Sequence, residues 1–406
     1  MYLPFLALEK YTILKINNLQ TTKGGIILNT KKFRTRQEFT KRINPKGKNY
    51  IIGLDAGYSS MKVYYEGGHF CFPSFLRAVS EEMLTVPSSA DILYKDENGE
   101  MYIIGTTAQN MISVNDTNDT ESELFGRKRY VQKSFQILCN TAIALALDDK
   151  KDNREIVVQT GLPTAYVEGD SEALKRALCK GSCFELKVGN GNWKQYRINL
   201  TKNNIYIMPQ PAGSFYSAII KQNGEYMPDA KDFLYNNTLT LDVGFGTCDF
   251  YGVKSRAIEC KESVDNIGMR EVLKRTSEYI LKELDEDIRV PSLQKNLESG
   301  VVIYVDEEEM KTEEKELSPI LEKANEEIFQ KAMVKAKGVT NAFREYKYLI
   351  VGGGTGEAWL EKIKEYLSGM KTLQIIPSNR NDNLAFIYSN VRGYYLYRYV
   401  LNKYKG

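Results

Sequence analysis

The same short pattern occurs twice in this chain: an apolar run ends in Asp-x-Gly and leads into a tight turn. Asp55-Ala56-Gly57 follows the apolar run at 50–54, and Asp242-Val243-Gly244 follows the run at 237–241. Each run is typical of a buried strand, and the segment after each turn has the pattern of a hairpin partner. This repeat predicts an α/β chain made of two similar lobes that bring both turns to one cleft, and it argues against a single doubly wound sheet.

The first turn combines small residues with one cation and one carboxylate. Glycine and serine in a hairpin turn expose backbone N–H groups that can surround a phosphate oxygen, and a lysine adds a point charge suited to a β- or γ-phosphate. Asp55 would be repelled by phosphate, so we expect it to hold Mg²⁺ through water. The predicted phosphate-binding residues of this turn are Gly57, Ser59, Ser60, Met61 and Lys62.

The second turn supplies the mirror set. Gly244 and Gly246 permit close approach of the backbone to a ligand, and Thr247 offers a hydroxyl group to phosphate. Asp242 is the second carboxylate, and we expect it to orient the attacking water or a second metal-bound water. Because the residues of the two turns complement each other, the two turns together predict a nucleotide site more strongly than either turn alone.

A third glycine-rich element follows the strand predicted at 346–351. Gly352, Gly353, Gly354 and Thr355 stand where that strand meets a helix, so their backbone can lie flat against a base or ribose. The segment lacks the G-x-G-x-x-G spacing of a Rossmann dinucleotide site and the Lys-Ser/Thr pair of a P-loop. Both of these motifs are therefore excluded.

Composition excludes several other kinds of chemistry. The 406 residues are more than one hydrophobic core usually organises, which predicts at least two lobes. His69 is the single histidine, so Ser-His-Asp, Cys-His and multi-histidine metal sites are excluded. The six cysteines are scattered and are expected to be reduced structural thiols.

Positive charge is concentrated at the start of the chain. Residues 1–48 hold eleven Lys/Arg and two Glu, whereas the whole chain has a net charge of only +3. This segment is expected to be a separate basic extension, and contact with DNA or RNA is the alternative interpretation. No run of eighteen apolar residues occurs, and the apolar start Met1–Leu8 lacks the flanks of a secretory signal, so we expect a cytoplasmic protein.

Taken in order, the three glycine-containing segments resemble the two phosphate loops and the adenosine motif of the actin and sugar-kinase ATPase superfamily. Roughly 190 residues separate the phosphate loops, and the resemblance covers about 49–405. It implies an actin-like two-lobe fold with duplicated ribonuclease-H-like domains around a nucleotide cleft. The lobe limits that it implies are 49–165 plus 376–406 for the first lobe and 166–375 for the second, after the extension at 1–48.

Within that superfamily the chain looks most like the plasmid-segregating bacterial actins of the ParM type. The resemblance implies that Gln210 acts on the nucleophilic water, and an amide there implies slow hydrolysis because it is not a strong base. It also places Arg270 and Glu271 near the ribose and base, and Asn390 and Gly393 at a hinge between the lobes. The segments that carry it are 159–163, 207–213 and 389–395.

The function implied by this resemblance is a filament-forming NTPase that segregates or positions plasmid DNA. It would use Mg²⁺ with ATP or GTP, polymerise with itself, and reach DNA through a separate adaptor protein of the ParR type, without a membrane. Two alternatives stay open at this point. One is a small-molecule kinase of the same superfamily, for which Asp242 would have to serve as the base, and the other is a membrane-associated actin-like scaffold.

Overall fold

The structure is a computed structural model that describes residues 21–22, 25–26, 29–84, 86, 88–112, 124, 126–306 and 308–404. The apolar start Met1–Leu8 and most of the first part of the basic extension lie outside these residues. The chain divides into two compact units. The smaller contains 1–34 and 272–327, and the larger contains 35–271 and 328–406.

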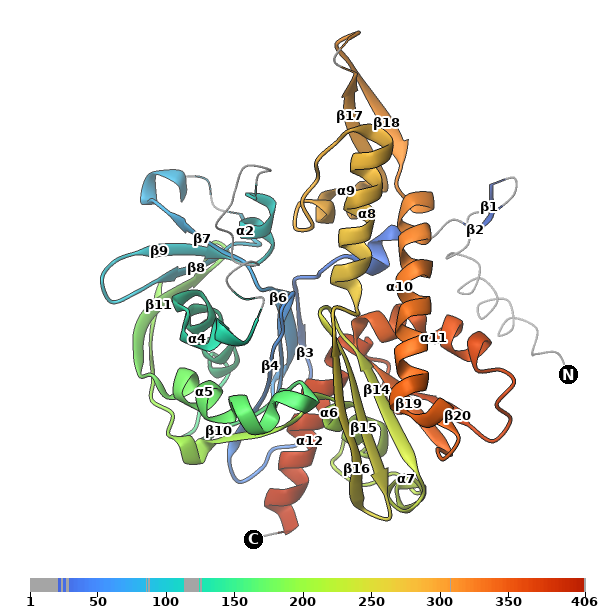
Figure 1. Ribbon diagram of the computed structural model, residues 1–406. Helices are drawn as coiled ribbons and strands as arrows, with labels where there is room; N and C mark the ends of the chain where they lie inside the picture. The colour runs from blue at the N-terminus through green and yellow to red at the C-terminus, as the bar shows by residue number, and fades with distance from the viewer. Residues whose placement is uncertain are drawn as a thin grey trace, which may run out of the picture. The chain divides into compact units, whose positions relative to one another are not determined.

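A six-stranded sheet forms the first half of the larger unit (Figure 1). Its order is β13-β10-β4-β5-β6-β3, in which β4, β10 and β13 are parallel and β5, β6 and β3 are antiparallel to their neighbours. The strands are β3 (Glu38–Lys41), β4 (Tyr50–Ala56), β5 (Ser60–Tyr65), β6 (Gly68–Pro73), β10 (Ile156–Leu162) and β13 (Ile205–Pro209).

A five-stranded sheet in the second half repeats this arrangement. Its order is β16-β15-β14-β19-β20, with an antiparallel β14–β15–β16 meander followed by parallel β19 and β20. Strand for strand this matches β6-β5-β4-β10-β13, so the predicted duplication and the α/β class are confirmed. The strands are β14 (Thr238–Val243), β15 (Thr247–Lys254), β16 (Ala257–Asp265), β19 (Tyr348–Gly352) and β20 (Gln374–Pro377).

The remaining elements of the larger unit are a second five-stranded sheet and the helices. The sheet has the order β12-β11-β8-β9-β7. Its strands are β7 (Leu76–Val79), β8 (Ile92–Lys95), β9 (Met101–Ile104), β11 (Ser182–Val188) and β12 (Lys194–Ile198). The helices are α2 (Thr106–Asn110), α4 (Lys133–Leu147), α5 (Val167–Cys179), α6 (Gln210–Ile219), α7 (Ala230–Tyr235), α11 (Gly354–Tyr366) and α12 (Ser389–Tyr404).

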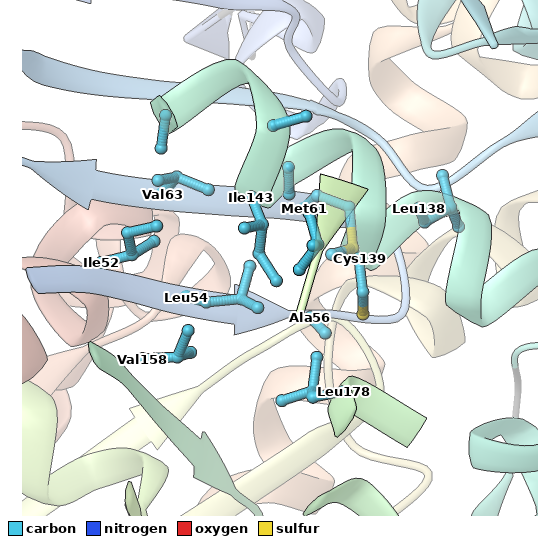
Figure 2. Close-up of a cluster of buried hydrophobic side chains, with 14 of the residues drawn as sticks. Ile52, Leu54, Ala56, Met61, Val63, Leu138, Cys139, Ile143, Val158 and Leu178 are labelled. Atoms are coloured by element: carbon cyan, nitrogen blue, oxygen red, sulfur yellow. The ribbon is translucent and has the colours of Figure 1, made fainter. Parts of the chain in front are cut away.

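The core of the six-stranded sheet explains why its strands read as continuous apolar runs. Every residue of β4 is buried. Helices α4 and α5 cover one face of the sheet. Figure 2 shows Ile52, Leu54 and Ala56 of β4 pointing toward Ile143 of α4, with Leu178 of α5 beside them. The turn that follows Ala56 is therefore held at a fixed position by a packed core.

Helices α6 and α12 pack against each other through glycine. A Cβ atom on Gly393 would lie 1.8 Å from the carbonyl oxygen of Gly213, and one on Gly213 would lie 2.6 Å from the carbonyl oxygen of Asn390. Only residues without a side chain permit this approach. Helix α12 contacts the six-stranded sheet, and α6 contacts both that sheet and the five-stranded sheet that contains β14.

In the smaller unit, a hairpin and a short helix lie in the sequence between two long helices. The hairpin is β17 (Val301–Asp306) with β18 (Lys311–Glu316), and α9 is Leu293–Ser299. The helices α8 (Met269–Leu284) and α10 (Ser318–Val339) continue from this unit into the larger one. The single turn η1 (Thr30–Phe33) lies on α9, where the Thr30 hydroxyl donates to the Leu297 carbonyl over 2.8 Å, and β1 (Thr21–Thr22) pairs with β2 (Gly25–Ile26).

Regular structure is already present before residue 49, where the first predicted lobe begins, since Glu38–Lys41 forms the edge strand β3. Helix α4 begins at Lys133, after the 3₁₀ turn η3 (Arg127–Val131). The lobe limits drawn from the sequence stay a prediction. None of the helices in the described part of the chain combines the length and apolar character needed to cross a membrane.

Candidate nucleotide site

The first predicted phosphate turn joins β4 to β5 and places a cation beside a carboxylate. Asp55 is 5% exposed near the end of β4, and its register partner on β5 is Lys62. The Lys62 ammonium donates to Asp55 Oδ2 over 3.1 Å. A Cβ atom on Gly57 would lie 2.7 Å from the Ser60 carbonyl oxygen and 2.8 Å from Lys62 Nζ, so the turn requires glycine at this position.

The other predicted residues of this turn, Ser59, Ser60 and Met61, offer a ligand their backbone more than their side chains. The Ser59 carbonyl accepts from the Ser74 backbone N–H over 2.9 Å, and the Ser74 hydroxyl donates to the Gly57 carbonyl over 3.0 Å. Ser60 is buried, and the side chain of Met61 belongs to the hydrophobic core. A ligand at this turn would therefore meet Met61 only through its main chain.

The second predicted turn joins β14 to β15 in the same way. Asp242 is 5% exposed on β14, and the Gly244 N–H donates to the Thr247 carbonyl over 3.0 Å to close the turn. The Gly246 carbonyl accepts from the Asn266 N–H. The Thr247 hydroxyl donates to Asp249 Oδ2 over 2.7 Å, so its proton is already engaged by a neighbouring carboxylate.

The start of α8 is bonded to this second turn. The backbone N–H of Arg270 donates to the Phe245 carbonyl over 2.9 Å, and Gly268 in front of it has a φ of +152°. A Cβ atom on Gly268 would lie 2.5 Å from the Gly244 carbonyl oxygen. The side chains of Arg270 and Glu271 form an ion pair with each other at 3.6 Å. The predicted ribose-contacting residues are thus fixed to the second phosphate turn.

The glycine run after β19 meets the same turn from its other side. Gly353 has a φ of +79°, and a Cβ atom on it would lie 2.3 Å from Asp242 Oδ1. The Thr355 hydroxyl in the first turn of α11 donates to the Gly244 carbonyl over 2.7 Å. A Cβ atom on Gly352 would lie 2.3 Å from the Ser214 hydroxyl oxygen, whereas one on Gly354 would meet the side chain of Ile387. These contacts place the run directly against Asp242.

Gln210 connects the first turn to α6. It is the first residue of that helix, and its Nε2 donates to Asp55 Oδ1 over 3.1 Å. Asp55 therefore accepts from Lys62 on one oxygen and from Gln210 on the other. The structure brings the amide predicted to position water next to the carboxylate predicted to hold the metal.

Asn390 connects Asp242 to both packed helices, a role that the sequence did not reveal. Its Nδ2 donates to Asp242 Oδ2 over 2.5 Å, and its Oδ1 accepts from the Ser214 hydroxyl and backbone N–H over 2.7 and 3.0 Å. Asn390 was expected only at a hinge. No signal local to Asn390 in the sequence points to this bond, because 148 positions separate it from Asp242.

Burial makes Asp242 an unusually weak acid. Desolvation raises its pKa to about 7, the Asn390 hydrogen bond opposes that rise, and repulsion from Asp249 and Asp55 adds to it. Both carboxylates are connected to the first part of α6, Asp55 through Gln210 and Asp242 through Asn390 and Ser214. A carboxylate with a pKa near 7 can accept a proton at neutral pH.

Asp249 and Arg129 are two further buried charges beside these turns that the sequence analysis did not single out. Asp249 is 2% exposed and accepts from the Thr247 and Ser263 hydroxyls and the Thr164 N–H; burial raises its pKa to about 6. The Arg129 guanidinium lies 4.5 Å from the ring centre of Tyr58 in the first turn, and its Nε has no hydrogen-bond partner. Asp249 lies two residues after Thr247, so a carboxylate next to the second predicted turn was the available signal.

The carboxylates fit a magnesium ion that also binds phosphate. Among the described residues, no group of three Asp, Glu, His or Cys side chains could hold a metal ion. Mg²⁺ commonly takes one or two protein carboxylates and completes its shell with water and substrate phosphates. Asp55 and Asp242 at the two turns match that requirement, and neither has a carboxylate-only cage around it.

Comparisons with known proteins agree with the fold. Residues 53–213 match the model for the N-terminal domain of actin-like proteins. The structure resembles ParM in a 15-stranded filament from Clostridium botulinum, with a TM-score of 0.66, 19% identity, and coverage of 86% of this chain and 98% of that one. It also resembles a non-polymerisable quadruple mutant of pCBH ParM, with a TM-score of 0.65, 20% identity, and coverage of 86% and 99%.

The chain has the actin-like fold. An archaeal actin homologue solved in complex with ADP is similar over 85% of this chain and 97% of its own, with a TM-score of 0.55 and 21% identity. A search of curated protein sequences finds no match. In the actin-like fold of this chain, one connected set of contacts in the larger unit contains all the predicted site segments. These are both Asp-x-Gly turns, the glycine run, the start of α8 and Gln210.

Proposed function

We propose that this protein is a nucleotide-dependent, filament-forming NTPase that hydrolyses ATP or GTP slowly with Mg²⁺. The observation that carries the proposal is the meeting of two aspartate-bearing hairpins from duplicated sheets, with Gln210 bonded to one aspartate and Asn390 to the other. Two similar structures, one solved in complex with ADP and one of a ParM filament, support nucleotide binding and filament assembly in this proposal.

Each part of the site has a role in this proposal. The backbone of the two turns and Lys62 bind the phosphates, and the glycine run with Arg270 and Glu271 receives the ribose and base. Asp55 and Asp242 would hold Mg²⁺ through bound water, and the ion when bound neutralises phosphate charge. Gln210 positions the attacking water, whose oxygen bonds to the γ-phosphorus as the bond to the β–γ bridging oxygen breaks and the nucleoside diphosphate leaves. The proton released by the attacking water passes to Asp242. Because an amide positions the water but is not a strong base, hydrolysis is slow. Slow hydrolysis suits a filament whose lifetime is set by nucleotide turnover.

The cargo assigned to the filament is plasmid DNA, in a cytoplasmic setting. In this proposal the DNA is reached through a separate DNA-bound adaptor of the ParR type, and the chain itself contributes the polymer. The support is the likeness to ParM structures in fold. Co-sedimentation of filaments with DNA in the presence and absence of a candidate adaptor protein would test this part separately.

A small-molecule kinase is the second candidate, and one observation favours it. Asp242 has a pKa of about 7, so it can deprotonate a substrate hydroxyl at neutral pH as readily as a water. A kinase would release ADP faster when its substrate is added. Stimulation of ADP release by a panel of sugars and polyols would support this candidate, whereas unchanged release would remove it.

Binding of fluorescent ATP and GTP analogues with Mg²⁺ tests the nucleotide part of the proposal. Wild-type protein should bind one of them, and Lys62→Ala should weaken that binding about tenfold or more, because one charge-assisted contact to phosphate is lost. The matched control is Lys180→Ala, an exposed lysine at the end of α5. Absence of binding by the wild type would contradict the proposed function.

A further inference from the structure

Two exposed surfaces of this chain take no part in the nucleotide site and have opposite charge. The first is the β17–β18 hairpin of the smaller unit, which Figure 1 shows extending beyond the end of α8. The second is the basic segment 35–48 of the larger unit, which contains its edge strand β3. We call these two surfaces the acidic hairpin and the basic edge.

The acidic hairpin presents apolar side chains that the described part of the chain leaves half exposed or more. Ile303 is 54% exposed, Val305 is 50% exposed, and Met310 at the tip is 80% exposed. Ile303 and Val305 alternate along β17 and so share one face of the two-stranded sheet. Their register partners on β18 are Glu314 and Thr312. An exposed β-branched row of this kind on a sheet with no third strand is a surface suited to pairing.

The charge around that apolar row is strongly negative. The described residues 306 and 308–316 include six acidic side chains and two lysines, and all six residues of β18 are exposed. One lysine, Lys311, pairs with Glu309 over 2.5 Å. Glu314 and Glu316 stand opposite Ile303 and Val301, so they flank the apolar face directly. A partner for this surface needs positive charge together with apolar side chains.

The basic edge has that combination. Residues 35–48 contain five Lys/Arg and one Glu, and β3 is the terminal strand of its sheet, with β6 on one side only. Arg42 is paired with Asp382. Phe39 of β3 is 49% exposed, and Ile43 just after it is 88% exposed. Arg36 lies just before β3, Lys41 is its last residue, and both are exposed. Lys41 is paired with Asp149, but a surface ion pair of this kind costs little to exchange.

We propose that the acidic hairpin of one copy of this chain docks on the basic edge of a second copy. The exposed side chains Ile303 and Val305 would meet Phe39 and Ile43, and the glutamates of β18 would face Arg36 and Lys41. The two surfaces are different patches of the same chain, so the contact is heterologous and leaves each end of a dimer open for further addition. The inference rests on the proposed filament function and names the surfaces that would form the filament.

Charge reversal on each surface tests this docking directly. The first variant carries Glu314→Lys and Glu316→Lys in the hairpin, and the second carries Arg36→Glu and Lys41→Glu at the edge. The control for the edge variant carries Arg176→Glu and Lys180→Glu, an equal charge change on an exposed side chain of α5 and on the exposed residue that follows it. Nucleotide-dependent pelleting is measured for each protein alone and for an equal mixture of the two variants. Binding of a fluorescent nucleotide analogue verifies that each variant is folded.

The docking predicts that each reversed variant alone needs at least tenfold more protein to pellet than the wild type, while the mixture pellets like the wild type. The mixture is restored because each reversed surface then meets a complementary one. Normal pelleting by either variant alone overturns the docking, and so does a mixture that stays soluble. Edge reversal that leaves pelleting intact but abolishes retention on DNA assigns the basic edge to nucleic acid instead. Failure of the wild type to pellet with any nucleotide defeats the proposed function itself.

Discussion

The side-chain amide of Asn390 lies between the carboxylate of Asp242 and the start of α6. It donates to Asp242 Oδ2 over 2.5 Å and accepts from both the hydroxyl and the backbone N–H of Ser214. Because Ser214 holds the amide oxygen, the Nδ2 group is fixed toward Asp242 as a donor. The protonation of a candidate catalytic group is thereby coupled to the packing of two helices that also meet at Gly213 and Gly393.

Replacing Asn390 by alanine should move the acid limb of hydrolysis to higher pH. The Asn390 hydrogen bond lowers the pKa of Asp242 against the effect of burial, so its loss raises that pKa above about 7. We expect an upward shift of about 0.5–1 pH unit in the rate profile between pH 5.5 and 9, in keeping with a hydrogen bond of about 1 kcal/mol. Asn402→Ala, on the same helix but bonded to Asn49, is the control. An unmoved limb would show that Asp242 does not titrate in the rate-limiting step.

Asp242→Asn should stabilise the nucleotide-free, metal-free protein at neutral pH. The folded pKa of about 7 lies above the ordinary value of 3.8, so the folded state holds its proton more tightly than the unfolded state does. Stability linked to Asp242 is therefore fully present below pH 4 and is lost as the pH rises toward 7, by about 2–4 kcal/mol. The melting temperature of the variant should exceed that of the wild type more at pH 8 than at pH 4.5. Equal differences at both values would contradict the raised pKa.

Gly393→Ala should be strongly destabilising, whereas Gly338→Ala should not. The new methyl group on Gly393 would lie 1.8 Å from a backbone carbonyl, but one on Gly338 in α10 meets no atom within 4 Å. We expect a loss of about 3 kcal/mol or more for the first change and a gain of about 0.5–1 kcal/mol for the second. Urea unfolding followed by circular dichroism provides the comparison. Similar midpoints for both variants would mean that α6 and α12 do not pack through these glycines.

Gln210→Ala should slow hydrolysis about 10–100-fold and leave nucleotide affinity nearly unchanged, because the amide acts on the water and not on the nucleotide. Gln210→Asn retains the amide group but is one methylene too short for the 3.1 Å contact with Asp55, so it should be equally slow. Phosphate release in single turnover separates this step from binding. Wild-type rates in both variants would remove Gln210 from the mechanism.

The parts of the site that could be predicted from sequence are those encoded by local pattern. Asp55, Asp242 and Gly353 each stand at the end of a buried strand next to small residues, and a strand end followed by glycine has few possible structures. The pairing of the two turns followed from their repetition. Gln210 was identified only through resemblance to a family, since one amide at the start of a helix has no pattern of its own.

The rest depended on contacts between distant segments. Asn390 binds Asp242 across two packed helices, and nothing near it in the sequence distinguishes it from other polar residues of α12. The β17–β18 hairpin was missed because Lys311–Glu316 is rich in glutamate and lysine, which favour helix or loop over strand. β17 supplies the partner that makes it a strand. The edge strand β3 was missed for the same reason, because only β6 completes it.

The most direct test of the account is light scattering by wild type and Asp242→Ala after addition of Mg²⁺ with ATP or GTP. The account predicts that scattering rises in both proteins, then decays in the wild type as nucleotide is hydrolysed, and persists in the variant. A matched Asp232→Ala variant, changed at an exposed residue of α7, should behave like the wild type. No rise with either nucleotide, in protein that demonstrably binds it, would contradict the claim that this actin-like chain is a hydrolysis-timed filament.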